Sequence, residues 1–253
     1  MIGKEIIRRI LPMNILVVND DSIHSPGIAL LAREAAKLGK VWVVAPASQC
    51  SAMSHRLSIN TALRVERAAD FPAPVEGAWS VSGTPADCVK AALLYLLKEK
   101  PDYVFSGIND GYNVGYDIAY SGTLGAAMEA VMNGIPAIAF SNAMRYPLDL
   151  PQAYLADIAR ELTEKPLGPG MVWNVNFPEV TPGELQGIAR DVTIANTQMY
   201  LDNYIAEPQS DGSLILTGCG IPLAPEAYVP EGSDIDVLRR GFVSIGRIKC
   251  AVM

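Results

Sequence analysis

NILVVNDDS, residues 14–22, is the stretch that decides the fold. Residues 14–18 form a short, nearly continuous apolar run, which predicts a strand buried on both faces of a parallel sheet. The polar residues that follow end this strand, and residues 28–39 then repeat apolar side chains at helical spacing up to a glycine. A buried strand, a polar loop and an amphipathic helix together form the repeating unit of α/β proteins.

The same unit recurs along the chain. Residues 57–68, LSINTALRVERA, alternate in polarity and predict one more extended strand. The order of elements predicts an α/β fold with a doubly wound, Rossmann-like, mostly parallel sheet and helices on both faces. Further strands are predicted at 41–45, 102–106, 136–141 and 171–177, and further helices at 87–98, 123–133 and 152–163.

Polar loops dominate beyond about residue 185. Residues 204–218, YIAEPQSDGSLILTG, predict a β-hairpin with SDGS at its turn. Because an isolated hairpin is marginal in water, we expect this C-terminal hairpin to be an oligomerisation arm. The predicted division is an N-terminal extension, residues 1–12, and one domain, residues 13–253, with its core at about 13–185 and its arm and C-terminal segment at about 186–253.

The composition argues against two classes of partner. With a formal net charge of −7, the chain lacks the clustered Lys and Arg that neutralise nucleic-acid phosphates, so no nucleic acid is expected. No apolar run approaches the roughly 20 residues that cross a bilayer, so no membrane partner is expected. Residues 1–12 lack the apolar stretch of a signal peptide, and the four cysteines form no C-x-x-C pair. We therefore expect a cytoplasmic protein with free thiols.

Polar side chains follow three of the predicted parallel strands. Asp20 and Asp21 come after the first strand, Ser51 lies in the loop after the second, and Asn109 follows strand 102–106. The carboxyl ends of parallel strands meet at one edge of a sheet, where α/β proteins bind ligands. Two carboxylates, a hydroxyl and an amide oxygen suit a hard divalent ion such as Mg²⁺ or Mn²⁺. An Asx turn or a helix cap also explains paired aspartates after a strand, and that alternative stays open.

The start of helix 123–133 is a second candidate site. Ser121, Gly122 and Thr123 are followed by small residues, so bare amides and the positive end of the helix dipole can face a phosphate. An ordinary N-cap by Ser121 or Thr123 explains the same residues. His55 is a candidate proton donor to a leaving group, although a histidine in a solvent-facing loop needs no such role.

In this order, these pieces resemble the SurE family of stationary-phase survival proteins, which are metal-dependent nucleotidases and acid phosphatases. One departure is Ser22, where the family usually has glycine after the aspartate pair. The matching segments run through about the first 180 residues and are VVNDDSIHSPGI, APASQCSAMSH, SGTPADCV, SGINDGYNVGYDIAYSGTLGAAMEA and NVNFP.

The resemblance implies a metal site, a phosphate pocket, and homodimers or homotetramers built through a projecting hairpin and an exchanged C-terminal segment. The hypothesis is a phosphomonoesterase with one divalent ion per subunit that hydrolyses nucleoside 5′-monophosphates, with 3′-nucleotides as a second substrate class. The metal would polarise a phosphoryl oxygen and activate the attacking water. The implied metal ligands are Asp20, Asp21, Ser51 and Asn109. The expected catalytic residues are Asp20, Asp21 and Asn109. The substrate phosphate is assigned to Asn19, Ser121, Gly122 and Thr123.

Two other interpretations start from the same acidic motif. A receiver-like Mg²⁺-binding signalling module needs an acceptor Asp after its third strand and a Lys after its fifth, but the chain has VFSGIN and IAFSNA there. A haloacid-dehalogenase-like phosphatase needs Asp-x-Asp, and Asn19 occupies the first of those positions.

Overall fold

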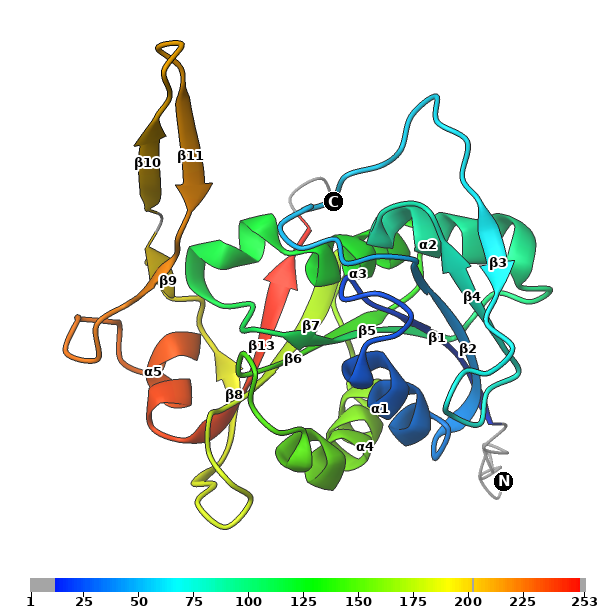
Figure 1. The fold of residues 1–253 in the computed structure, drawn as a ribbon. Coiled ribbons are helices and arrows are strands. Elements are labelled where there is room, and N and C mark those ends of the chain that lie inside the picture. Colours follow the sequence, from blue (N-terminus) through cyan, green and yellow to red (C-terminus); the bar gives the residue numbers. More distant parts are fainter. Residues whose placement is uncertain (1–11, 202, 251–253) are drawn as a thin grey trace.

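The computed structural model describes residues 12–201 and 203–250, which build a nine-stranded sheet between two layers of helices (Figure 1). The strand order is β3-β4-β2-β1-β5-β6-β7-β13-β8. This arrangement confirms the predicted α/β fold with a doubly wound, mostly parallel sheet. The parallel strands are β4 (Gly77–Val81), β2 (Gly39–Pro46), β1 (Met13–Val18), β5 (Tyr103–Asp110), β6 (Ala137–Asn142) and β7 (Met171–Phe177).

Both edges of the sheet depart from the parallel arrangement. At one edge, β3 (Val65–Arg67) pairs antiparallel with β4. At the other, β13 (Phe242–Lys249) pairs antiparallel with β7, and β8 (Gly187–Val192) pairs parallel with β13. The sheet therefore continues past residue 185, where we placed the end of the core, because a C-terminal strand lies between β7 and β8.

Successive residues of β1 pack into opposite layers. Ile15 and Val17 contact the layer that contains α1 (Pro26–Ala35) and α4 (Asp149–Glu164). Leu16 and Val18 contact the layer that contains α2 (Pro85–Ala91) and α3 (Gly122–Met132). All four side chains are fully buried. Burial on both faces explains why the strand is continuously apolar. Burying each such side chain contributes about 1.5–3 kcal/mol to the free energy of folding.

Two predicted elements differ from the structure. The helix predicted at 87–98 begins at Pro85 and ends in a π-helical turn, η1 (Ala92–Leu96). Only Val65–Arg67 of the strand predicted at 57–68 forms a strand. Residues 57–64 have no neighbouring strand and are exposed or half-buried. An alternating pattern gives a strand only where a partner strand supplies the hydrogen bonds.

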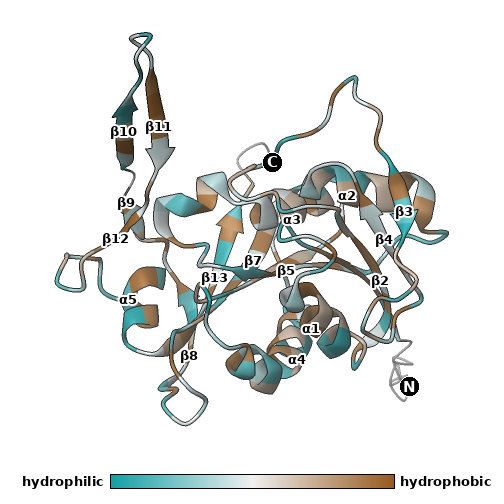
Figure 2. Cartoon of the chain, in the orientation of Figure 1, coloured by the Kyte–Doolittle hydropathy of each residue, from teal (hydrophilic) through white to brown (hydrophobic). Residues whose placement is uncertain are grey.

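The predicted hairpin is confirmed and projects from the rest of the molecule (Figure 1). Its strands are β10 (Tyr204–Pro208) and β11 (Leu214–Gly218), and every residue of both strands is exposed. We call residues 204–218 the arm. Figure 2 shows that apolar residues predominate on β11. The short strands β9 (Tyr200–Leu201) and β12 (Ile221–Pro222) join the arm to the part of the chain that carries η2 (Gly115–Tyr120) and α5 (Asp234–Arg239).

The cysteines and the helices bear on the expectations of free thiols and of no membrane partner. All four cysteines are free, and Cys50, Cys88 and Cys250 are buried. Within the described residues, no helix combines the length and apolarity that crossing a membrane requires.

Candidate metal centre and active site

The strand order reverses between β1 and β5. From β1 the sheet continues through β2 to β4, and from β5 it continues through β6 to β7 in the other direction. Loops that leave neighbouring strands at such a point diverge and leave a crevice. Asp20 and Asp21 follow β1, and Asn109 lies near the end of β5. The topology therefore brings these three predicted residues to one edge of the sheet.

Local hydrogen bonds fix the turn between β1 and α1. Ser25 caps α1 by accepting a hydrogen bond from the Ile28 amide, and Pro26 begins the helix. The Asn19 side-chain amide donates to the Ser22 carbonyl at 2.8 Å and to the Ser25 hydroxyl at 3.0 Å. Asn19 is fully buried, and its Oδ1 has no partner among the described residues. Its contacts give Asn19 a positioning role in this turn.

Asp20 is buried against the start of α3. Its Oδ1 accepts a hydrogen bond of 2.7 Å from the Thr123 hydroxyl, and its backbone carbonyl accepts one of 2.7 Å from the Cys50 amide. A Cβ atom at Gly122 would lie 3.0 Å from Asp20 Cβ and 3.1 Å from Oδ2. Glycine at this position therefore lets the first turn of α3 approach the carboxylate closely.

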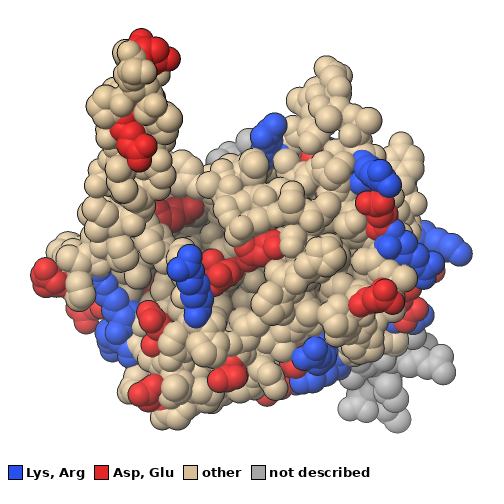
Figure 3. Space-filling model, viewed as in Figure 1, with Lys and Arg blue, Asp and Glu red and all other residues tan. Residues whose placement is uncertain are grey.

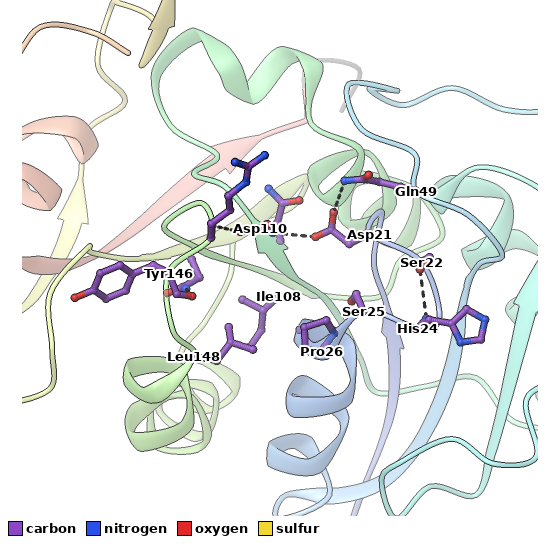
Figure 4. Close-up of a pocket in the computed structure, with 14 residues that line it drawn as sticks. Asp21, Ser22, His24, Ser25, Pro26, Gln49, Ile108, Asp110, Tyr146 and Leu148 are labelled. Atoms are coloured by element: carbon purple, nitrogen blue, oxygen red, sulfur yellow. Dashed lines mark hydrogen bonds between the residues drawn. The ribbon is translucent and has the colours of Figure 1, made fainter. Parts of the chain in front are cut away.

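Asp21 faces the opposite side, toward the end of β5. Its Oδ2 accepts a 2.8 Å hydrogen bond from the Asp110 amide, and its Oδ1 accepts a 3.2 Å hydrogen bond from the side-chain amide of Gln49 (Figure 4). The loop after β2 and the last residue of β5 thus hold this carboxylate from two directions.

The two carboxylates carry negative charge that the described residues do not balance. None of the Lys, Arg and His side chains in the described part of the chain forms an ion pair with Asp20 or Asp21. Burial raises the pKa of Asp20 to about 7, while the Thr123 hydroxyl lowers it and the neighbouring Asp21 charge raises it. Burial also raises the pKa of Asp21, although the Asp110 amide opposes that shift. A buried carboxylate is stable when it is paired or bound to a metal, so the buried Asp20 with the half-buried Asp21 beside it fits a divalent cation.

The other two expected ligands, Asn109 and Ser51, would each add an oxygen atom to the two carboxylates. Asn109 lines a cavity together with Asp21. Its Nδ2 donates to the Gly111 carbonyl at 2.8 Å, which leaves its Oδ1 as the atom that can coordinate a cation. Ser51 is exposed and directly follows Cys50, whose carbonyl oxygen would lie 3.3 Å from a Cβ at Gly122. No group of three or more His, Cys, Asp or Glu side chains with metal-site spacing occurs in the described residues. Carboxylate, amide and hydroxyl oxygens are the ligand atoms that a hard cation prefers.

The α3 start uses its side chains internally. Ser121 is the N-cap, and its hydroxyl oxygen accepts a 3.1 Å hydrogen bond from the Leu124 amide. Thr123 is fully buried, and its hydroxyl donates to Asp20. The N-cap explanation is therefore correct for Ser121, while the amides of Gly122 and Thr123 remain at the positive end of a helix.

A cavity of about 390 Å³ opens beside Asp21 (Figure 4). On the face drawn in Figure 3, acidic side chains gather in the hollow at its middle. The sequence pattern missed Gln49, Asp110 and Arg145, which line this cavity, although each lies in a loop after a predicted strand. The full lining is Asp21, Ser22, His24, Ser25, Pro26, Gly27, Gln49, Ile108, Asn109, Asp110, Asn142, Arg145, Tyr146 and Leu148.

His55 is not in this cavity. Its Nε2 lies 2.8 Å from Oε2 of Glu129, a buried residue of α3 that also pairs with Lys90. These contacts fasten the loop after β2 to α3, which is a structural role.

Comparisons with known proteins found relatives of this chain in both sequence and fold. The family model described as "Survival protein SurE" matches residues 15–202. A protein named 5′-nucleotidase SurE from Synechococcus elongatus is 39% identical over 242 residues, with 92% of each chain covered. Another of that name, from Desulfatibacillum aliphaticivorans, is 44% identical over 181 residues and 70% of each chain. The crystal structure of a SurE protein from Aquifex aeolicus superimposes with a TM-score of 0.78 at 31% identity and 93% coverage of both chains.

Proposed function

The chain belongs to the SurE family, and on this basis we propose that it is a metal-dependent phosphomonoesterase that hydrolyses nucleoside 5′-monophosphates to nucleoside and phosphate. The observation that supports this most directly is a pair of carboxylates without an ion-pair partner among the described residues: Asp20, buried against the N-terminus of α3, and the half-buried Asp21 next to it. Positive charge from a cation and from helix amides suits a dianionic phosphate ester. The receiver-like alternative gains no support from the comparisons.

Asp20, Asp21, Asn109 and Ser51 would hold the cation. When bound, a divalent ion such as Mg²⁺ or Mn²⁺ supplies Lewis-acid charge for a phosphoryl oxygen and acidifies water. The chain orients the ligands: the Thr123 hydroxyl holds Asp20, and the Asp110 and Gln49 amides hold Asp21. Hydrogen bonds of this kind keep a ligand oxygen directed at the metal.

The substrate phosphate would lie at the start of α3. The Gly122 and Thr123 amides donate to its oxygens, and the Ser121 hydroxyl, whose oxygen already accepts from Leu124, still has its proton to donate. Each preorganised donor to developing charge contributes about 3 kcal/mol to the transition state. We assigned Asn19 to the phosphate from sequence. In the structure its side-chain amide instead holds the turn that carries Asp20 and Asp21, by hydrogen bonds to Ser22 and Ser25.

Phosphate release tests the function. Purified protein is treated with EDTA, dialysed, and supplied with Mg²⁺ or Mn²⁺ in the presence of a panel of nucleoside 5′- and 3′-monophosphates or p-nitrophenyl phosphate. We expect no release without metal and restored release with it, with nucleotides preferred. Metal-independent release, or none from any ester, would refute the proposal.

We also propose that the chain forms a homodimer or homotetramer through the arm. Apolar side chains lie exposed on both strands, with Ile205 57%, Leu214 59% and Leu216 55% accessible. A two-stranded hairpin with no core of its own is marginal, and an exposed apolar surface of this kind marks an interface.

A further inference from the structure

The loop between β6 and α4, residues 143–148, places a cationic side chain at the cavity beside Asp21. Arg145 lines the cavity and is exposed, and its guanidinium forms no hydrogen bond or ion pair with the described residues. The other formally charged residues of the lining, Asp21 and Asp110, are both acidic. Arg145 is therefore a cationic donor in this cavity that the described residues leave without a partner.

The backbone of Arg145 is held in a fixed relation to the metal carboxylates. Its amide donates a 2.6 Å hydrogen bond to Oδ1 of Asp110, and the amide of Asp110 donates at 2.8 Å to Asp21. The Asn142 side-chain amide donates to the Tyr146 and Pro147 carbonyls at 3.0 and 3.3 Å, which fixes the rest of the loop. Arg145 has a φ of 55°, a left-handed conformation that favours glycine or asparagine over a long side chain. Loop conformation alone therefore does not account for an arginine here.

The cavity extends away from the phosphate side of the site. Its lining includes Asp21 and Asn109 but none of Asp20, Gly122 and Thr123, against which the proposed phosphate position lies. Figure 4 shows Pro26, Ile108 and Leu148 on the side of the cavity away from Gln49. A volume of about 390 Å³ with apolar walls and a few polar groups is typical of a small-molecule site and exceeds what a phosphate needs.

From this geometry we propose that Arg145 is a specificity-determining residue that binds the nucleoside part of the ester. The base lies against the apolar wall of Pro26, Ile108 and Leu148, and the guanidinium donates to acceptor atoms of the base or ribose. A guanidinium has donors and no acceptors, and its planar fork matches paired acceptors such as O6 and N7 of guanine. This assignment rests on the proposed function, because that function places the phosphate at α3.

Separate binding of the two products tests the assignment. Isothermal titration of the metal-loaded protein with guanosine and with inorganic phosphate is carried out for wild type and for Arg145→Gln. We expect the Kd of guanosine to rise about tenfold, the loss typical of a hydrogen bond from a charged group, and the Kd of phosphate to stay within about twofold. In turnover of GMP, KM should rise by a similar factor with kcat nearly unchanged.

A matched variant controls for charge and folding. Arg160→Gln removes one positive charge from α4, where Arg160 pairs with Asp157 on the surface, and should leave both Kd values unchanged. An equal loss of phosphate and guanosine affinity in Arg145→Gln would place Arg145 on the phosphate and overturn the assignment, as would no loss of either. If wild type releases no phosphate but binds guanosine through Arg145, the proposed function fails and the nucleoside site stands.

Discussion

The carboxyl edge of the sheet and the arm make opposite use of burial. At the sheet edge, polar groups are buried or half-buried and form hydrogen bonds inside the chain, as Asp20 does with Thr123 and Asp21 does with Asp110. On the arm, apolar groups such as Leu214 and Leu216 are exposed and have no core to enter. The first region lacks positive charge, which a cation can supply, whereas the second lacks a covering apolar surface, which another protein surface can supply. Each region therefore indicates what kind of molecule completes it.

The largest effect is expected from Asp21→Asn. The substitution keeps the shape of the side chain but removes a metal-binding charge, so kcat/KM for a nucleoside monophosphate should fall by at least about a hundredfold at saturating Mn²⁺. The melting temperature should not fall, because like-charge repulsion with Asp20 is removed. The control is Asp157→Asn, the same change at an exposed position of α4. Wild-type turnover by Asp21→Asn would contradict the assignment of the active site to this edge of the sheet.

The arm is tested by Leu216→Asp. In the hairpin register Leu216 lies opposite Ala206, on the face that also carries Leu214. A charge in a buried apolar contact should weaken assembly by about 2–4 kcal/mol, so analytical ultracentrifugation should show smaller species at the same concentration. The far-ultraviolet circular dichroism should not change, because Leu216 is 55% exposed and belongs to none of the hydrophobic clusters of the described residues.

Thr217→Asp places the same charge on the opposite face of β11 and serves as the matched control. Dissociation by Thr217→Asp alone would assign the interface to the other face. Unchanged assembly in both variants would mean that the arm does not carry the contact.

A smaller effect is expected from Thr123→Val, which replaces the hydroxyl that holds Asp20 with a methyl group of similar size. We expect the Mn²⁺ concentration for half-maximal activity to rise about tenfold, since oriented ligands bind a metal more tightly. Thr123→Ser keeps the hydroxyl and should restore most of the affinity. If Thr123→Ser needs as much Mn²⁺ as Thr123→Val, the loss of metal affinity comes from altered packing and not from the lost hydrogen bond.

The smallest effect is expected from Ser22→Gly. Ser22 has a φ of 85°, a region that glycine adopts without steric cost. The substitution should stabilise the metal-free protein by up to about 1 kcal/mol, which corresponds to a rise of about 2 °C in Tm. Activity should stay within about twofold of wild type, because the one hydrogen bond of the Ser22 hydroxyl within the described residues is accepted from the His24 amide. A clear drop in kcat would show that the Ser22 side chain itself contributes to turnover.

Several features were predictable because their signals are local. A continuous apolar run ending in Asn19-Asp20-Asp21 indicates a buried parallel strand and a ligand edge, and the SDGS turn indicates the hairpin. Other features had no local signal. The amide of Asp110 on Asp21, Gln49 on Asp21 and the Arg145 loop all depend on which strands become neighbours. The place of β13 between β7 and β8 likewise depends on a pairing across about 70 residues, which periodicity does not report.

By itself, the sequence determined the alternation of strands and helices, the family, and which oxygen-bearing side chains end the strands, because burial and turn formation act on neighbouring residues. Only the tertiary structure decided which of those side chains share a site and what lies between them. Asp20 and Thr123 are 103 positions apart and meet at 2.7 Å, because the sheet order reverses between β1 and β5 and the bare Gly122 lets α3 close in on the carboxylate.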